Sequence, residues 1–447
     1  MKTISTALSK VWAKTGAVLI AALPLAVWAQ TSVLPKADAV FEDFSDAEVA
    51  LGRLLFYDPI LSGSQDVSCA TCHHPKMATV DALSLGLGDG AVGLGLDRVV
   101  DPDNMPEIRI PRNAPALFNL GAAEFKVLFH DGRLETDPSK PNGIRTPLGD
   151  DMLVGFTSAL SAQSMFPVLS PDEMAGHYSE NDVAQAVRQG FLTGEGGAWD
   201  IISKRVGDIP EYRQQFDGVI GAGQDITFPA ISNAIAAFIA DEWRADQSPF
   251  DTYLRDGTPM SDAAMAGMEL FYGEAGCATC HSGQFQTDHS FHAIAMPQIG
   301  PGKSARFESH ARDVGRMRVT GDPADAYAFR TPSLRNVALT APYGHSGAYK
   351  TLRGVIEHHL DPIASFEAYD IAEAVLPDLP NAVDTWVLGR DHERAAVMAA
   401  NSLDPIALSD AEVDQIIAFL NALTDDASLR AGSGVPATVP SGLEVDQ

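Results

Sequence analysis

The chain has 447 residues, with 59 acidic and 31 basic side chains, so its formal net charge at pH 7 is −28. A field of this sign disfavours nucleic acid and anionic membrane surfaces as partners. It fits either a solvated acidic surface, which is the simpler interpretation, or the steering of a basic redox partner. At this length two or three domains are expected.

Residues 1–29 have the pattern of a secretory signal peptide. Lysines supply a basic start, residues 17–26 form a short apolar run, and residues 27–29 form a small-residue cleavage site. The apolar run is too short to span a bilayer, and no later stretch is long enough to do so. We therefore expect an exported, periplasmic protein with no membrane insertion.

The pentapeptide Cys-Ala-Thr-Cys-His occurs twice and uses all four cysteines of the chain. Cys-x-x-Cys-His is the attachment signal for c-type haem, in which two thiols bond to the haem and the histidine binds its iron. A single copy would also fit a zinc site or a disulfide, but two copies with no spare cysteine favour two covalently bound haem c groups. The predicted attachment residues and proximal ligands are Cys69, Cys72, His73, Cys277, Cys280 and His281.

A weak internal repeat surrounds the two pentapeptides. Leu-Phe-Tyr precedes each of them, and Ser-Asp-Ala opens a helical pattern before each. Ser-Asp-Ala occurs again at Ser409, where Glu412 completes a capping box ahead of a last amphipathic helix. These patterns predict a mainly α fold. They indicate two cytochrome c-like helical domains, each with one covalently bound c-type haem, packed around an interdomain interface.

The end of a helix over residues 231–243, followed by a stretch rich in Pro and Asp, marks the expected boundary between the domains. The sequence thus predicts a first haem domain over 30–247 and a second over 248–425. Residues 426–447 are polar and contain several prolines, which favours a disordered tail.

Several longer motifs occur in a fixed order along the chain, and together they resemble the bacterial di-haem cytochrome c peroxidase family, which includes MauG-like enzymes. The resemblance runs from residue 51 to about residue 424. Besides the two pentapeptides, the segments that carry it are residues 51–59, 112–119, 129–133, 170–174 and 330–343.

The resemblance implies that the first haem reacts with peroxide and that the second passes electrons. It places the distal acid at Glu173, within Pro-Asp-Glu-Met, and a distal glutamine at Gln163. Peroxide cleavage needs such a base, which takes a proton from one oxygen and returns it to the leaving one. The alternatives are a solvated glutamate in the first turn of a helix and an ordinary surface glutamine.

The resemblance also implies a calcium site between the two haem domains. Its ligands would include the Asn113 side chain and the carbonyl groups of Thr340 and Pro342. Hard oxygen ligands of this kind suit Ca²⁺. Without the resemblance, Asn113 would be interpreted as a turn residue.

Two departures from the family pattern concern the iron ligands. Where many members have a histidine that caps the first iron, this chain has Leu87, which cannot bind iron. We therefore expect a five-coordinate, high-spin first haem. The position that carries Met or Tyr in other members is His359 here, so the second haem is expected to have two histidine ligands, His281 and His359. The alternatives for the sixth ligand are His358, His292 and Met317.

A third departure lies between the haems, where the tryptophan of the family is replaced by His130. Imidazole is a poorer electron relay than indole, which places the usual route between the haems in question.

Three functions are compatible with these residues. The first is a periplasmic peroxidase that reduces hydrogen peroxide with electrons from a small cytochrome c or a cupredoxin. The second is a MauG-like enzyme that uses peroxide to oxidise aromatic residues of a partner protein. The third is a non-enzymatic di-haem electron carrier, which the distal glutamate and the open iron position disfavour. Dimers are common in the family, so a homodimer is among the expected states.

Overall fold

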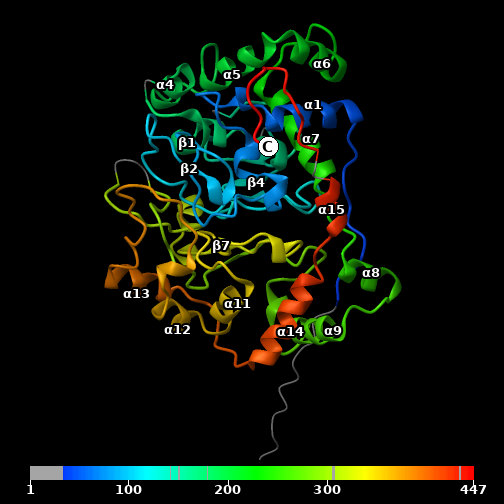
Figure 1. Cartoon of the computed structure of the whole chain (residues 1–447), viewed down its shortest axis with the longest axis vertical. Helices are drawn as coiled ribbons and strands as arrows, with labels where there is room; N and C mark the ends of the chain where they lie inside the picture. Colours follow the sequence, from blue (N-terminus) through cyan, green and yellow to red (C-terminus); the bar gives the residue numbers. More distant parts are fainter. Residues whose placement is uncertain (1–33, 141, 150–151, 179, 305–307, 432–433) are drawn as a thin grey trace, which may run out of the picture.

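Figure 1 shows the computed structural model, which describes all residues except 1–33, 141, 150–151, 179, 305–307 and 432–433. The chain forms two lobes stacked along the long axis, the first half above and most of the second half below in this view. The expected signal peptide lies outside the described residues. Among the residues that are described, no helix is both long enough and apolar enough to cross a membrane.

The first lobe is built around the crossing of two helices. The first of them begins at a capping box, in which Ser45 and Glu48 satisfy each other's backbone N–H groups. It crosses the longest helix of the lobe so closely that a Cβ atom on Gly52 would overlap the carbonyl oxygen of Ala234. The helices of this lobe are α1 Asp46–Tyr57, α2 Cys69–Cys72, α3 Ala159–Gln163, α4 Asp182–Arg188, α5 Ala198–Gly207, α6 Pro210–Ile220 and α7 Phe228–Glu242.

The second lobe repeats this arrangement. Its last long helix begins at the predicted capping box of Ser409 and Glu412 and packs against the helix that precedes the second pentapeptide. The close approach is again at a glycine, because a Cβ atom on Gly267 would overlap the carbonyl oxygen of Gln415. The remaining helices are α8 Pro249–Asp256, α9 Asp262–Tyr272, α10 Met317–Thr320, α11 Leu352–Leu360, α12 Pro362–Glu367, α13 Asp391–Ala399, α14 Asp410–Asn421 and α15 Asp426–Ala431.

Strands are few and short in the described part of the chain, so the prediction of a mainly α fold is confirmed. They pair antiparallel in three small sheets, of two, three and two strands. The strands are β1 Ala91–Val92, β2 Val99–Val100, β3 Val127–Leu128, β4 Leu134–Thr136, β5 Ile144–Arg145, β6 Phe291–His292 and β7 Phe329–Arg330.

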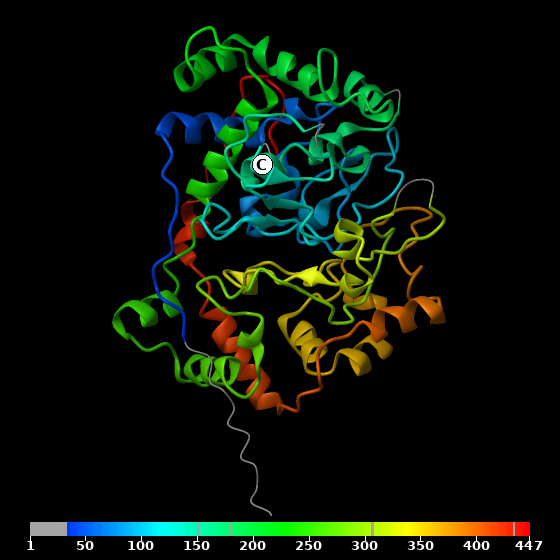
Figure 2. The ribbon, with the colours of Figure 1, turned by 180° about the vertical axis from the view of Figure 1, so that it is seen from behind.

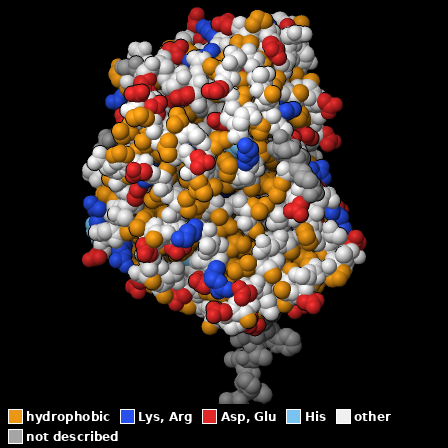
Figure 3. All heavy atoms as spheres, viewed as in Figure 1, with side chains coloured by type: hydrophobic (Ala, Val, Ile, Leu, Met, Phe, Trp, Pro, Cys, Tyr) orange, Lys and Arg blue, Asp and Glu red, His pale blue; other side chains and the backbone are white. Residues whose placement is uncertain are grey.

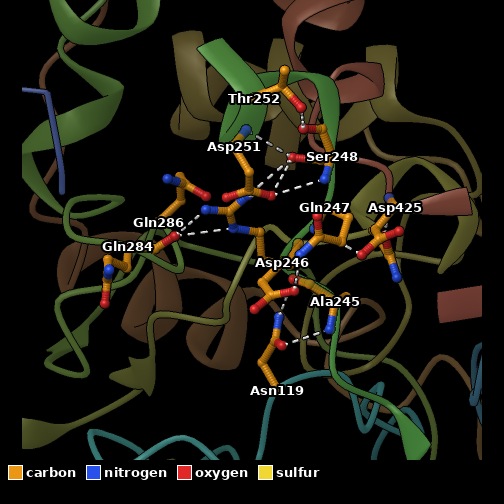
Figure 4. A network of polar contacts seen from close by, with 12 residues as sticks. Asn119, Ala245, Asp246, Gln247, Ser248, Asp251, Thr252, Gln284, Gln286 and Asp425 are labelled. Carbon is orange, nitrogen blue, oxygen red and sulfur yellow. Dashed lines mark hydrogen bonds and ion pairs between the residues drawn. The ribbon is translucent and has the colours of Figure 1, made fainter. Parts of the chain in front are cut away.

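Apart from Leu34 and the C-terminal residues, the two largest apolar cores divide along the chain between Ala245 and Phe250. This connection is held by polar contacts (Figure 4). Asn119 accepts from the N–H of Ala245 at 2.8 Å and donates to its carbonyl oxygen at 2.9 Å, while the N–H of Gln247 donates to Asp425 at 2.9 Å. Each such bond contributes about 1 kcal/mol, so the connection is a defined part of the fold.

A buried ion-pair cluster joins the two lobes. Arg112, from the first lobe, makes two parallel hydrogen bonds of 2.8 and 2.9 Å to Asp313 of the second. The same guanidinium lies 2.8 Å from Asp131. All three side chains are almost fully buried, and Arg112 holds the pKa of Asp313 well below its usual range. Loss of one partner would leave a buried charge without compensation.

The prediction of a disordered tail is wrong. After α15, residues 434–447 run back over the first lobe and end beside α1 and α7, as Figures 1 and 2 both show. Val439 is 5% exposed within the first core, and Ser441 donates to Asp58 at 2.7 Å. Asp446 accepts from Thr71, inside the first pentapeptide, at 2.5 Å. Four apolar residues spaced along the polar tail provide the packing that its composition conceals: Val435, Val439, Leu443 and Val445.

On the face seen in Figure 3, acidic side chains are spread around the surface, and apolar side chains gather across its middle. The charge on this face is therefore distributed and not concentrated in one patch.

Candidate functional site

The first pentapeptide lies at the wall of a cavity in the first lobe. Its two cysteines are the ends of the single turn α2, so both thiols project from one short element. The turn is held by Thr71, whose hydroxyl accepts from the N–H of Ser68 at 3.0 Å. Both cysteines and His73 line the cavity, and none of the four cysteines of the chain is in a disulfide.

His73 is oriented by its own backbone segment. Its Nδ1 donates to the carbonyl oxygen of Thr79 at 2.9 Å, which leaves Nε2 as the nitrogen available to a metal. Burial lowers the pKa of His73, so the imidazole is neutral, as metal binding requires. Two thiols, a neutral imidazole and an adjoining cavity with largely apolar walls fit a c-type haem.

Both predicted catalytic residues line the same cavity. Gln163 is the last residue of α3, and Glu173 lies in a wide helical turn, Pro171–Ala175. The loop before β1 supports this turn, because the N–H of Asp89 donates to the carbonyl oxygen of Glu173 at 3.0 Å. Gly88 lies so close to the turn that a Cβ atom there would overlap the Glu173 backbone.

Leu87 does not line the cavity, although Gly86 beside it does. Its side chain is fully buried and packs with Ala91 and Leu379. Its carbonyl oxygen accepts from Arg98, whose guanidinium also binds the carbonyl groups of two nearby glycines. The loop is thus held with its apolar side chain turned into the core.

Four further charged residues line this cavity that sequence reasoning did not identify as site residues: Asp81, Arg112, Arg133 and Lys303. Burial raises the pKa of Asp81 to about 7. Arg133 belongs to the Phe-His-Asp-Gly-Arg segment, donates to Asp131 at 3.1 Å and stacks 3.6 Å from the ring of Phe129. Lys303 comes from the second half of the chain, and no pattern in the sequence around it indicates a site.

The second pentapeptide repeats the ligand geometry of the first. The Nδ1 atom of His281 donates to the carbonyl oxygen of Gln286 at 3.0 Å, and burial lowers the pKa of His281 to about 4. The ring of His359 lies opposite, with the two ring centroids 6.3 Å apart. An imidazole nitrogen from each ring could hold a haem iron between them. This pair of imidazoles fits a second haem.

Two of the alternative ligands, His358 and His292, make other hydrogen bonds. Both nitrogens of His358 are bonded, Nδ1 to the hydroxyl of Tyr349 at 3.0 Å and Nε2 to the carbonyl oxygen of Ile294 at 2.8 Å. His292 binds Asp288 at 2.8 Å, and Met317 begins α10. In contrast, His359 uses only Nδ1, which donates to Val355 within its own helix.

His130 and the expected calcium ligand Asn113 lie between the lobes. The Nε2 atom of His130 donates to the carbonyl oxygen of Asn113 at 3.0 Å. The N–H of Asn113 donates to His345 at 2.9 Å, which joins Asn113 to the segment that follows Thr340 and Pro342. The side-chain nitrogen of Asn113 donates to the carbonyl oxygen of Leu83 at 2.8 Å. These hydrogen bonds of Asn113 therefore go to His130, His345 and Leu83, and those described do not join it to Thr340 or Pro342.

Residues 46–258 match the di-haem cytochrome c peroxidase family. The methylamine utilization protein MauG of Methylorubrum extorquens is 30% identical over 362 residues, which cover 78% of this chain and 80% of that protein. The cytochrome c peroxidase of Escherichia coli is 33% identical over 319 residues, or 70% of this chain and 53% of that one. A solved MauG-like protein associated with microbial copper homeostasis has a TM-score of 0.58 and 25% identity, covering 90% of this chain and 95% of its own.

The chain therefore belongs to the di-haem cytochrome c peroxidase family. It is an oxidoreductase of the di-haem peroxidase type, a family whose cofactors are c-type haems.

Proposed function

We propose that this protein is a periplasmic di-haem peroxidase that reduces hydrogen peroxide to water with electrons from a small redox protein. The observation that carries the proposal is the first cavity, where His73, Gln163 and Glu173 line one space and Leu87 is turned away from it. This arrangement supplies an iron ligand and two polar groups for peroxide. Position 87, a leucine, supplies no second histidine for the iron.

In this proposal haem is bound covalently to Cys69 and Cys72, with His73 as ligand, and supplies the iron that exchanges electrons with peroxide. Gln163 orients the peroxide by hydrogen bonding. The Glu173 carboxylate takes a proton from one peroxide oxygen and returns it to the leaving oxygen. With two electrons and two protons supplied in total, one peroxide gives two molecules of water.

The second haem is assigned to Cys277, Cys280 and His281, with His359 as the sixth ligand. Replacement of Met by His lowers the reduction potential, within the range of about 0.8 V that axial ligands span. This haem would therefore store and pass electrons without binding peroxide itself. The division into domains over 30–247 and 248–425 and the calcium ligands Asn113, Thr340 and Pro342 are parts of the same proposal.

Mixing the fully oxidised enzyme with one equivalent of hydrogen peroxide, followed by reduced cytochrome c, tests the function. We expect an optical change at a high-spin haem and rapid oxidation of many equivalents of cytochrome. A purely low-spin EPR spectrum of the oxidised enzyme, with no response to peroxide, would contradict the proposal and leave the electron carrier.

A MauG-like oxidation of a partner protein is the second candidate. Two observations favour it. Position 87 is a leucine and not the iron-capping histidine of many members, and His281 is paired with His359. In that case the experiment gives a long-lived state, oxidised by two equivalents, that turns over cytochrome only slowly.

A further inference from the structure

Among the residues that the structure describes, Lys303 is the one from beyond position 239 that lines the first cavity. Every other residue of the cavity wall lies between positions 56 and 239. The turn that carries Lys303 is firmly placed against both lobes. Gly300 donates to Asp384 at 3.0 Å and approaches Leu85 of the first lobe so closely that a Cβ atom would overlap its side chain.

Lys303 and Glu173 line the same cavity, and Glu173 is one of the two carboxylates whose charge acts on Lys303. The ammonium group of Lys303 interacts with the carboxylates of Glu173 and Asp131 and with the guanidinium groups of Arg133 and Arg112. Asp131, however, is already held by both arginines, at 2.8 Å and 3.1 Å. Burial and the nearby arginines lower the pKa of Lys303.

We infer that Lys303 is a positioning cation on the peroxide side of the first cavity, and that this site is complete only when the second half of the chain is docked. The inference rests on the proposed function. When Glu173 takes a proton from hydrogen peroxide, the products are a carboxylic acid and the hydroperoxide anion. The ammonium group of Lys303 offsets the charge of that anion until Glu173 returns its proton to the leaving oxygen.

Binding of small ligands to the oxidised holoenzyme tests this role without turnover. Fluoride is a small anion that binds ferric haem, and imidazole is a neutral ligand of the same iron. Their dissociation constants are measured by absorption in the wild type and in Lys303→Met, Lys303→Arg and Lys76→Met. The last is a control, because exposed Lys76 carries the same charge outside the cavity.

For Lys303→Met we expect fluoride binding at least about tenfold weaker, the effect of roughly 1.4 kcal/mol of lost charge interaction, with imidazole binding unchanged. Lys303→Arg retains fluoride binding, and Lys76→Met resembles the wild type. If Lys303→Met binds fluoride as tightly as the wild type does, the inference is overturned. A parallel loss of fluoride and imidazole binding, which indicates a collapsed cavity, also overturns it.

If Lys303→Met does not incorporate haem, Lys303→Gln, which retains a polar side chain, is judged by the same two ligands. The inference and the proposed function fail separately. An enzyme inert to peroxide whose fluoride binding depends on Lys303 contradicts only the function. An active peroxidase whose fluoride binding is independent of Lys303 contradicts only the inference.

Discussion

At the scale of single residues, Glu173 and Gln163 lie ten positions apart in the chain and line the same cavity as His73. Glu173→Gln keeps the size of the side chain but removes the base. We expect its reaction with peroxide to slow by about 10²–10⁴-fold, the usual contribution of a general acid–base group. Stopped-flow absorption at the high-spin haem measures this rate. Exposed Glu195, changed to Gln, is the control, and an unchanged rate in Glu173→Gln would exclude Glu173 as the base.

The two adjacent histidines of α11 differ in what their nitrogens contact. His359 faces His281, whereas His358 is bonded on both sides within the core. We expect His359→Ala to lose the low-spin EPR signal of the second haem. His358→Ala should keep that signal and lose stability, because Tyr349 and Ile294 are left with buried polar groups unpaired. The reverse pattern would assign the ligand to His358.

At the scale of helices, glycine permits the close crossings α1–α7 and α9–α14. Alanine ordinarily favours a helix over glycine by about 0.8–1 kcal/mol, but at Gly267 it would overlap the backbone of α14. We expect Gly267→Ala to lower the free energy of unfolding by about 1–3 kcal/mol, the usual effect of overpacking. Gly218 in α6 has open space around its missing Cβ, so Gly218→Ala should be neutral or stabilising. Guanidinium denaturation followed by circular dichroism compares the two variants.

The C-terminal segment links the end of the second half to the first lobe. A chain ending at residue 433 loses the buried Val439 and the bonds from Ser441 and Asp446 to the first lobe. We expect this truncation to lower the free energy of unfolding by several kcal/mol, since full burial of one aliphatic side chain contributes about 1.5–3 kcal/mol. The absorption of the first haem during denaturation should report the loss. Equal stability of the truncated and full chains would contradict a structural role for the segment.

At the scale of the whole molecule, the Arg112–Asp313 pair makes the junction of the two lobes sensitive to acid. The folded-state pKa of Asp313 lies below that of an unfolded aspartate, about 3.9, because Arg112 favours its ionised form. The contribution of ionised Asp313 to the free energy of unfolding is therefore present above pH ~4. It is lost as the pH falls through the lower pKa of the folded state.

Asp313→Asn leaves Arg112 with Asp131 alone, and we expect it to cost about 3–5 kcal/mol at pH 7. The difference from the wild type should begin to shrink as the pH falls below about 4, because Asp313 of the unfolded wild type is then protonated while Asp313 of the folded wild type stays ionised. Guanidinium denaturation at pH 7 and pH 3.5 measures both values. Glu357→Gln, which removes an exposed partner of Arg353, should change stability little at either pH. A difference for Asp313→Asn that does not depend on pH would exclude this electrostatic origin.

The sequence by itself determined the helical class, the two pentapeptides and the capping boxes at Ser45 and Ser409. Each of these depends on residues close together in the chain: a thiol pair and its histidine occupy five positions, and a capping box occupies four. The similarity of the two halves was visible for the same reason. The motif order also indicated Glu173, Gln163 and His359 as site residues before their positions in space were known.

Tertiary structure alone decided the contacts between distant segments. Lys303 enters the cavity of the first half because its turn packs against Leu85, and nothing near it in the chain indicates this. The final segment is ordered because its few apolar side chains meet the core of the first lobe, although its composition suggests disorder. Whether a side chain is buried, and which charges lie beside it, depends on residues that are close in space but distant in the chain. Local sequence patterns do not contain that information.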